Sequence, residues 1–565
     1  MAPSPSSSPV QVGTLFLGGG NAAGYFAAEY DKIISADPSL KDSAFGGSLT
    51  VVSGERSVSY ERPALSKAYL APKGPARLPG FHSCVGGGGE RQEASWYEAR
   101  GIEYRLGSEA TEVDAASRTV TLADGSVLGY KKLVIATGCR PVDLAKDFKM
   151  PGAEEGGGGN VFYLRDVADA DRLYSALEKA AASSGSGSDS GARPLVIGGG
   201  YIGEERRERD GEREREERDG ERERERRERE REKREKREGE RDFFFLPLSR
   251  PSTPAPPKKK KLSLGLELAA ALAGWGLQPV VAFPEDRILA RILTPDAAAF
   301  YAKFYELKGA ELRPGTTVKA LERKEGGDAV SAAVLSDGTS LSVSLVVVGV
   351  GARPRTELFG ESGGGGGGSG PGAIAVVGGA PGGVLVDARL RSVSADDVWA
   401  CGDVAAFPSG CLFGGRKGEE EGPTRQEHVQ HARSSAAFVA RDIVARSSSS
   451  PSSPSYAYLP YYYSRVFDLG WVFYGSSSPG STESVEFGER DAEAAAVRGE
   501  KKQTFGSFHL EVDDEKRERR VVGAFLEGGS PEQNAAVKKL VEARAVVEEG
   551  SALGIEWASA KAAKL

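Results

Sequence analysis

Two glycine-rich turns in this chain have the spacing that holds the phosphates of a dinucleotide. The first, GGGNAAG, covers residues 18–24, and the second, GGGYIG, covers residues 198–203. Each follows a short apolar strand pattern, and such a turn at the start of a helix presents backbone N–H groups to a pyrophosphate. One turn alone is weak evidence, but two in one chain predict two nucleotide-binding domains.

An acidic residue at the end of a second strand supports each turn. Glu55 ends the strand pattern LTVVSGE, and Glu285 follows the apolar strand at residues 279–283. A carboxylate in this place accepts hydrogen bonds from the hydroxyls of a ribose. Glu55 lies further from its turn than the usual ~20 residues, which implies an extended first crossover.

The second unit is interrupted by a charged segment at residues 204–265. Gly200 and Glu285 are 85 positions apart, and removing these 62 residues reduces the separation to 23, close to the usual ~20. The removal also joins GGGYIG to LELAAALAGWG, whose apolar residues have helical periodicity. The segment therefore interrupts an otherwise complete βαβ unit.

Three interpretations of the charged segment remain open. Its Arg and Glu residues could pair at i,i+4 on a solvated helix, or it could be disordered, because it has few apolar side chains to bury. A retained intron is the favoured hypothesis, since the codons at Gly203-Glu204 and Leu264-Gly265 can contain a splice donor and an acceptor. If the segment is translated, Glu204 and Glu205 place like charge beside the pyrophosphate and weaken nucleotide binding.

The composition argues against a nucleic-acid-binding protein, a membrane protein, a secreted protein and a metalloprotein. Acidic residues outnumber basic ones outside the charged segment, so we expect no nucleic-acid partner. No apolar run reaches the about 18 residues that span a membrane, and the first residues lack the pattern of a signal peptide. The cysteines form no CxxC or CxxxxC pair and the histidines have no metal-ligand spacing, so we expect a reducing compartment and no metal.

The elements that must hold these residues are mostly alternating strands and helices. That order predicts doubly wound parallel sheets, whereas the last hundred or so residues suggest antiparallel strands followed by helices. The predicted fold class is therefore α/β, with two Rossmann-like domains and a C-terminal α+β domain. The expected boundaries are 11–165 with 372–450 for the first domain, 166–360 for the second, and 451–565 for the third.

Three later motifs indicate that the first nucleotide is a flavin. YKKLVIATG at 130–138, LVVVGVGARP at 345–354 and VWACGDVAAF at 398–407 occur in the order found in flavoproteins. Asp403, in the last motif, resembles the aspartate that binds the ribityl chain of FAD. The first domain is therefore expected to bind FAD and the second NAD(P)H, with a hydride passing between their stacked rings.

The chain resembles one family over nearly its whole length, outside the charged segment and the Gly/Ser tracts. That family is monodehydroascorbate reductase of plants and algae, and the similar stretches are YERPALSKAYL (60–70), RLPGFHSCVGGGGERQEASWY (77–97), TRQEHVQHAR (424–433), YLPYYYSRVFDLGWVFYG (458–475) and VVGAFLEGGSPEQN (521–534). The resemblance implies a glutathione-reductase-like fold with FAD, which NADH reduces and two monodehydroascorbate radicals re-oxidise. The missing CxxxxC pair fits direct transfer from the flavin to a small substrate.

The resemblance also assigns cofactor-binding positions. It implies that Glu285 favours NADH, while the neighbouring Arg287 could attract the 2′-phosphate of NADPH and soften that preference. The implied contacts are Gly18, Gly20 and Glu55 for the FAD pyrophosphate and ribose, Arg62 and Lys67 for the flavin, Asp403 for the ribityl chain, and Gly198, Gly200 and Gly203 for NAD(P)H.

For the substrate, the resemblance assigns Arg433, Tyr463 and Gly86. A guanidinium can neutralise the ascorbate radical anion, and a tyrosine can pack beside the flavin and hydrogen-bond the substrate. Without the resemblance, Arg433 would be interpreted as a surface residue of a helix and Tyr463 as strand packing. Gln430 stands where the family usually has Asp, which weakens any charge-based role at that position.

Two other functions and two compartments are considered. A ferredoxin- or rubredoxin-reductase-like enzyme would pass electrons to a protein, but such relatives tend to carry tryptophans where this chain has Tyr461 and Tyr463. The Arg/Glu segment could instead make the flavoprotein an interaction scaffold. Residues 563–565, AKL, resemble a peroxisomal address, so we expect a peroxisomal protein with a cytosolic pool. The oligomeric state stays open.

Overall fold

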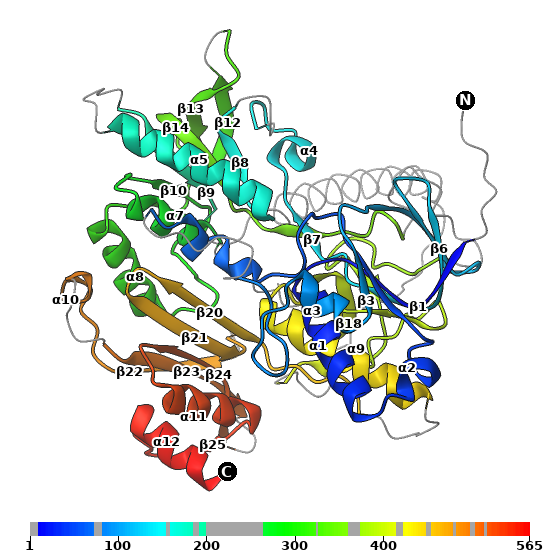
Figure 1. Cartoon of the computed structure of the whole chain (residues 1–565). Helices are drawn as coiled ribbons and strands as arrows, with labels where there is room; N and C mark the ends of the chain where they lie inside the picture. The colour runs from blue at the N-terminus through cyan, green and yellow to red at the C-terminus, as the bar shows by residue number, and fades with distance from the viewer. Residues whose placement is uncertain are drawn as a thin grey trace, which may run out of the picture.

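A computed structural model describes twelve stretches of the chain. They are residues 9–72, 82–153, 159–184, 191–198, 264–323, 326–359, 373–413, 422–447, 454–477, 482–497, 503–513 and 517–565. Gly200, Gly203 and residues 204–263 of the charged segment lie outside them. Helices and strands in the described stretches build two α/β domains and a C-terminal α+β domain (Figure 1).

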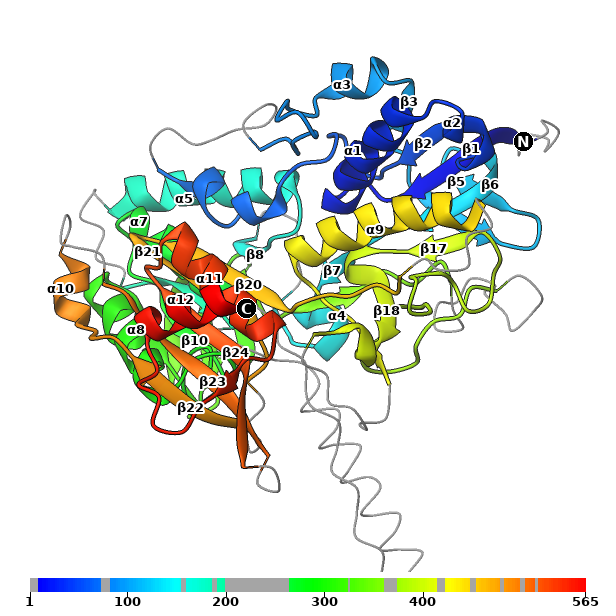
Figure 2. The same ribbon diagram turned by 90° about the horizontal axis from the view of Figure 1, so that it is seen from below.

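The first domain is built on a sheet of order β3-β2-β1-β6-β5-β4, with β17 beside β6. The strands β3, β2, β1, β6 and β17 are parallel, and α1 and α9 pack on each other beside the sheet (Figure 2). Apolar side chains make β1 and β2 buried strands. The elements are β1 (Val10–Leu17), α1 (Asn21–Ala36), α2 (Leu40–Ser43), β2 (Leu49–Val52), α3 (Ala94–Glu98), β3 (Ile102–Arg105), β4 (Ala110–Asp114), β5 (Thr119–Leu122), β6 (Val127–Ile135), β17 (Val398–Ala400) and α9 (Val429–Ser447).

The second domain repeats this plan with the sheet order β11-β10-β9-β14-β13-β12 and β8 beside β14. Its parallel part is β11, β10, β9, β14 and β8. The elements are β8 (Val161–Tyr163), α5 (Val167–Ser184), β9 (Arg193–Ile197), α7 (Leu264–Gly274), β10 (Val280–Ala282), α8 (Pro295–Leu307), β11 (Glu311–Arg313), β12 (Val318–Arg323), β13 (Val330–Leu335) and β14 (Ser340–Val348).

Two short antiparallel strands connect these domains. The chain leaves the first domain through β7 (Cys139–Pro141) and returns through β15 (Ala352–Pro354), and Arg140 lies opposite Arg353. Both guanidinium groups bind Asp147 of α4 (Leu144–Phe148), at 2.9 Å for Arg140 and 3.2 Å for Arg353. The shared carboxylate offsets the repulsion between the two cations and holds the connection together.

The C-terminal domain is an antiparallel sheet of order β20-β21-β24-β23-β22, with β25 beside β24. Helices α11 and α12 cover it in Figure 2, and Ser530 caps α11 through a capping box with Gln533. The elements are β20 (Tyr461–Val466), β21 (Leu469–Gly475), β22 (Thr482–Phe487), α10 (Ala492–Ala496), β23 (Phe505–Asp513), β24 (Glu518–Glu527), α11 (Pro531–Glu542), β25 (Val546–Val547) and α12 (Ile555–Lys564). None of the helices in the described stretches is long and apolar enough to cross a membrane.

The remaining described elements are short. They include β16 (Val384–Leu385), β18 (Ala405–Pro408) and β19 (Pro423–Thr424), which form a three-stranded sheet, and the 3-10 turns η1 (Arg62–Ala64), η2 (Ala68–Leu70), η3 (Gly402–Val404) and η4 (Ser409–Cys411). The turns η1 and η3 contribute residues to the cavity described next.

Candidate functional site

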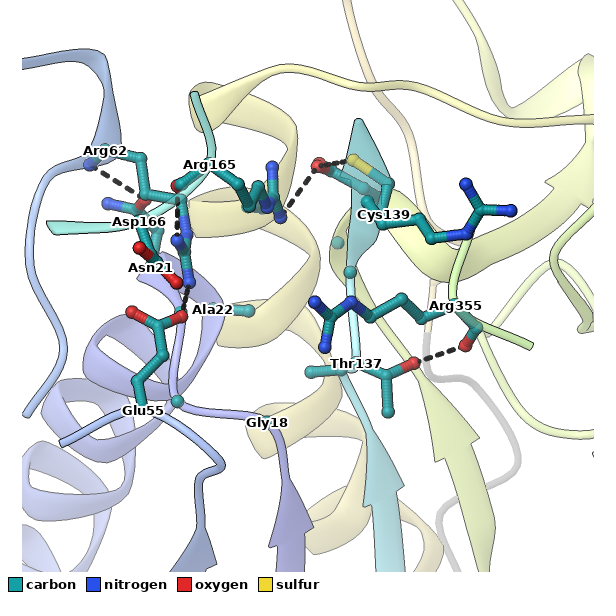
Figure 3. A pocket seen from close by; sticks show the side chains of 18 of the residues that line it. Gly18, Asn21, Ala22, Glu55, Arg62, Thr137, Cys139, Arg165, Asp166 and Arg355 are labelled. Carbon is teal, nitrogen blue, oxygen red and sulfur yellow. Dashed lines mark hydrogen bonds and ion pairs between the residues drawn. The ribbon is translucent and has the colours of Figure 1, made fainter. Parts of the chain in front are cut away.

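A cavity of about 750 Å³ lies where the first glycine turn, η1, β7, α7 and α9 meet. It opens at the carboxyl ends of β1 and β2, where ligands bind in doubly wound sheets. Its walls include Gly18, Gly20, Glu55, Arg62, Lys67, Asp403 and Tyr463, so seven of the predicted site residues are brought together. Figure 3 shows part of this wall from close by.

The first glycine turn leaves room for a ligand because side chains are excluded there. Gly18 has φ +128°, and a Cβ on it would lie 2.2 Å from the carbonyl oxygen of Ala136. Gly20 precedes the first residue of α1 and lines the cavity. A Cβ added to Gly20 would lie 3.6 Å from the Arg62 guanidinium. A helix N-terminus beside a guanidinium is suited to the pyrophosphate of FAD.

Glu55 and Arg62 form an ion pair on this wall (Figure 3). Glu55 also accepts a hydrogen bond of 2.6 Å from the Tyr60 hydroxyl, and Arg62 donates one of 2.8 Å to the carbonyl oxygen of Arg165. Burial opposes ionisation of Glu55, but Arg62 and the hydrogen bonds outweigh it and lower the pKa of the carboxyl below its usual range. Glu55 is therefore an ionised acceptor, as recognition of ribose hydroxyls requires.

Lys67 meets a buried acid that the sequence analysis missed. Its Nζ lies 2.5 Å from Oε2 of Glu267 in the first turn of α7, and the hydroxyls of Ser66 and Ser464 donate to the same carboxylate at 2.5 and 2.8 Å. Glu267 is 7 % exposed and links the two nucleotide domains to the C-terminal sheet. The letters LEL gave only a helical pattern, because the partners of Glu267 lie about 200 positions away.

Asp403 also has an unexpected partner. The Cys139 thiol donates to its Oδ2 over 3.1 Å, and Arg165 lies 3.8 Å from the same oxygen. Burial raises the pKa of Cys139 well above its usual value, so the thiol stays protonated and acts as a donor. Cys139 and Arg165 were not predicted; Figure 3 shows both beside the cavity.

The structure describes Gly198, the first residue of the second glycine turn, and then the chain from Leu264 onward. Gly198 has φ +107°, and a Cβ on it would lie 2.6 Å from the carbonyl oxygen of Gly349. Gly265 packs against Gly198, since a Cβ on Gly265 would lie 1.6 Å from the Gly198 carbonyl oxygen. Helix α7 begins at Leu264, so it includes the last two residues of the predicted charged segment. Gly265 therefore makes a close helix–strand contact at the start of α7.

Glu285 follows β10 as predicted, and its carbonyl oxygen accepts a hydrogen bond of 2.8 Å from the Gly315 amide. The neighbouring Arg287 forms a 2.9 Å ion pair with Asp286 and donates to the carbonyl oxygen of Ala290 at 3.2 Å. The charge of Arg287 is therefore partly balanced on the protein itself.

Two of the three predicted substrate residues lie within electrostatic reach of each other, because the charge of Arg433 acts on the Tyr463 hydroxyl. Tyr463 lines the main cavity, whereas Arg433 of α9 lines a second cavity of about 470 Å³ with Tyr25 and Gln430. Gly86 lines neither of these two cavities: its amide donates to the carbonyl oxygen of Glu90 over 2.8 Å, in a turn that faces Glu90.

The two histidines of the HVQH motif are buried and neutral. His428 lines the main cavity edge-on to Tyr463, with ring centroids 5.6 Å apart, and His431 bonds the Tyr456 hydroxyl at 3.0 Å. Burial lowers the pKa of His428 to about 3 and that of His431 to about 4. Within the described stretches, no group of three or more potential metal-binding side chains is found.

Comparison with known proteins identifies the family. The pyridine nucleotide-disulphide oxidoreductase model matches residues 14–206 and 263–436, and the C-terminal domain model of monodehydroascorbate reductase 3-like proteins matches 459–558. The monodehydroascorbate reductase of Pisum sativum is 34% identical over 96% of this chain and 97% of its own length. That of Solanum lycopersicum is 35% identical over 96% and 98%.

Solved structures confirm the fold. The putidaredoxin reductase–putidaredoxin complex has a TM-score of 0.65 at 21% identity and covers 99% of this chain and 100% of that one. A ferredoxin reductase of Rhodopseudomonas palustris has a TM-score of 0.64 at 21% identity, covering 97% and 100%. FAD and NAD(P)H, the expected cofactors, are those of the matched family. The chain belongs to the pyridine nucleotide-disulphide oxidoreductases and, among them, to the monodehydroascorbate reductase family.

Proposed function

We propose that the chain uses NADH to reduce the monodehydroascorbate radical to ascorbate. The observation that carries this proposal is similarity to enzymes of that name over nearly the whole of both chains. FAD, when bound, accepts a hydride and releases its two electrons singly, which suits a radical acceptor. The four cysteines are all buried and none forms a disulfide, and only Cys139 lines the main cavity, which agrees with the absence of a redox disulfide.

The residues of the main cavity have distinct roles in this proposal. Gly18, Gly20 and Arg62 hold the pyrophosphate, Glu55 the ribose and Asp403 the ribityl chain. Lys67 and Glu267 fix the wall at the junction of the three domains. Glu285 accepts from the ribose of NADH and disfavours the 2′-phosphate of NADPH through charge repulsion. Gly198 and Gly265 shape the turn for NAD(P)H, with Gly200 and Gly203 as further proposed contacts.

Arg433 and Tyr463 are the proposed substrate contacts. Arg433 is 30 % exposed and carries the positive charge that an ascorbate radical anion requires. Its pKa is raised, chiefly because Glu61 outweighs the opposing effect of burial, so the guanidinium stays charged. Tyr463 packs at the cavity wall with its hydroxyl available to orient a small substrate.

The proposal is tested by NADH oxidation with enzymatically generated monodehydroascorbate. Arg433→Ala should raise the KM for the radical about tenfold, the loss expected for a charge-assisted contact. Arg446→Ala is the control on the same helix, since Arg446 also pairs with an acid, Asp396, but lines neither cavity, and should change the KM less than about twofold. If the parent chain reduces ferricyanide but not the radical, the proposed substrate is wrong and a protein acceptor is favoured.

We also propose a peroxisomal location with a cytosolic pool. Residues 563–565, AKL, are exposed at the end of α12, as a receptor-read address must be. Relatives in Oryza sativa are named as peroxisomal and as cytosolic enzymes. A fluorescent protein fused to the N-terminus should co-localise with a peroxisomal marker, and deletion of these three residues should abolish that pattern.

A further inference from the structure

The carboxylate of Glu61 is held between two helices at the predicted acceptor site. Its Oε2 accepts from Nδ2 of Asn21 at 2.6 Å and pairs with Nη2 of Arg433 at 2.7 Å, while Oε1 accepts from the Tyr25 hydroxyl at 2.7 Å. Asn21 and Tyr25 belong to α1 and Arg433 to α9. The Glu61 side chain is 19 % exposed, so solvent does little to weaken this pair.

This arrangement changes the charge that an approaching acceptor meets. Arg433 supplies one positive charge and Glu61 one negative charge within hydrogen-bond distance. Tyr25 stays neutral, because burial and Glu61 both raise its pKa. Among the described residues, the wall of the second cavity carries Arg433 and Arg441 but no acid; Arg441 pairs with Glu29 at 3.0 Å, and Glu61 is the acid that pairs with Arg433.

We propose that Glu61 sets the charge selectivity of the acceptor site: it orients Arg433 and offsets its charge, so that a singly charged anion is accepted and multiply charged anions are disfavoured. This inference rests on the proposed role of Arg433 in contacting the acceptor. Coulomb energy scales with the product of the charges, so a fixed carboxylate repels a trianion three times as strongly as a monoanion. Arg433 alone would reverse that preference.

Glu61→Gln separates this role from simple structural support. Glutamine keeps the shape and still accepts hydrogen bonds but has no charge. The matched control is Asp396→Asn, because Asp396 also pairs with an arginine of α9, Arg446, at 3.5 Å, and neither residue lines the two cavities. Each variant is assayed as the FAD-loaded protein with NADH and three acceptors: a neutral benzoquinone, the monodehydroascorbate monoanion and the ferricyanide trianion.

In Glu61→Gln, kcat/KM should rise by about twofold for each negative charge on the acceptor, since solvent partly screens the lost carboxylate. The neutral quinone should therefore show no change, the monoanionic radical a rise of about twofold, and the ferricyanide trianion a rise of about tenfold. Asp396→Asn should leave all three values within about twofold. Equal changes for the three acceptors, or a uniform fall, would show that Glu61 is only a structural support.

Arg433→Gln provides an independent arm if Glu61→Gln does not fold or bind FAD. It leaves Glu61 without its cation, so the order should reverse and ferricyanide should lose most activity. A loss that ignores acceptor charge would overturn the inference. Failure of the proposed function looks different: the parent chain would not reduce the radical, while quinone and ferricyanide would still report the charge order.

Discussion

The thiol of Cys139 donates a hydrogen bond to Asp403, with 3.1 Å between Sγ and Oδ2. The first strand of the domain connection thereby orients the carboxylate proposed to bind the ribityl chain. Cys139→Ala should weaken FAD binding about tenfold, because a hydrogen bond to a charged group is lost, and Cys139→Ser should retain it. Fluorescence titration of the apoprotein with FAD measures this, with Cys411→Ala as the buried control. Equal losses in the Ser and Ala variants would contradict the hydrogen-bonding role.

Gly265 offers a sharp test of the second nucleotide site. Gly265→Ala places a methyl group 1.6 Å from the Gly198 carbonyl oxygen, so the helix must move away from the turn. We expect the KM for NADH to rise at least about tenfold while the bound FAD content stays unchanged. Gly274→Ala is the control in the same helix, since a Cβ there meets nothing within 4 Å. An unchanged KM in Gly265→Ala would show that this contact does not shape the site.

The position of Gly265 also predicts the outcome of two deletions. Removing residues 204–265 keeps Ile202-Gly203 before Leu266, and removing 202–263 keeps Leu264-Gly265 instead. Both shortened chains have an apolar residue and a glycine at the start of α7, so they should have equal KM values for NADH, below that of the full chain. Steady-state kinetics of the three proteins measure these KM values. If the full chain has the same KM for NADH as the shortened chains, the charged segment does not disturb the site.

Glu267 should matter for stability as well as for the site. Glu267→Gln keeps hydrogen-bonding atoms for Ser66 and Ser464 but leaves the Lys67 ammonium without its charge partner. The free energy of unfolding should fall by about 3 kcal/mol. Urea unfolding measures the change, and Glu103→Gln, at an exposed pair with Arg105, should cost less than about 1 kcal/mol. Similar losses in both variants would contradict the linking role of Glu267.

His428 and His431 should make the fold sensitive to acid. Their pKa values in the fold are about 3 and about 4, below the ordinary 6.5, so the unfolded chain binds more protons between these limits. Their contribution to stability is complete above pH 6.5 and is lost as the pH falls toward 4, at roughly 1.4 kcal/mol per unit for each residue. Urea midpoints from pH 7 to 5 should decline, and less steeply in His431→Gln. If the urea midpoints of the parent chain and of His431→Gln decline equally with pH, His431 does not contribute to the acid sensitivity.

The sequence was sufficient for the parts of the site that depend on local pattern. Gly18, Gly198, Glu55 and Asp403 follow apolar strands, and their places at strand ends follow from that order. Contacts between distant elements were not predictable in the same way. Glu61, Glu267 and Cys139 look ordinary in sequence, and only the meeting of α1, α7, α9 and β7 gives each a partner. Gly203, which the resemblance assigned to the NAD(P)H turn, lies outside the described residues, and the close contact of Gly265 with Gly198 is visible only in the packing.

The pairing of β17 with β6 has a consequence for how the chain matures on the ribosome. The edge of β6 that β17 covers cannot be completed until the whole second domain has been synthesised. Nascent chains that stop before residue 398 therefore leave one edge of β6 unpaired at residues 133–135, and such an edge is a site of mispairing and aggregation. A lengthened second domain prolongs that exposure, so the charged segment adds to the time the newly made chain depends on chaperones.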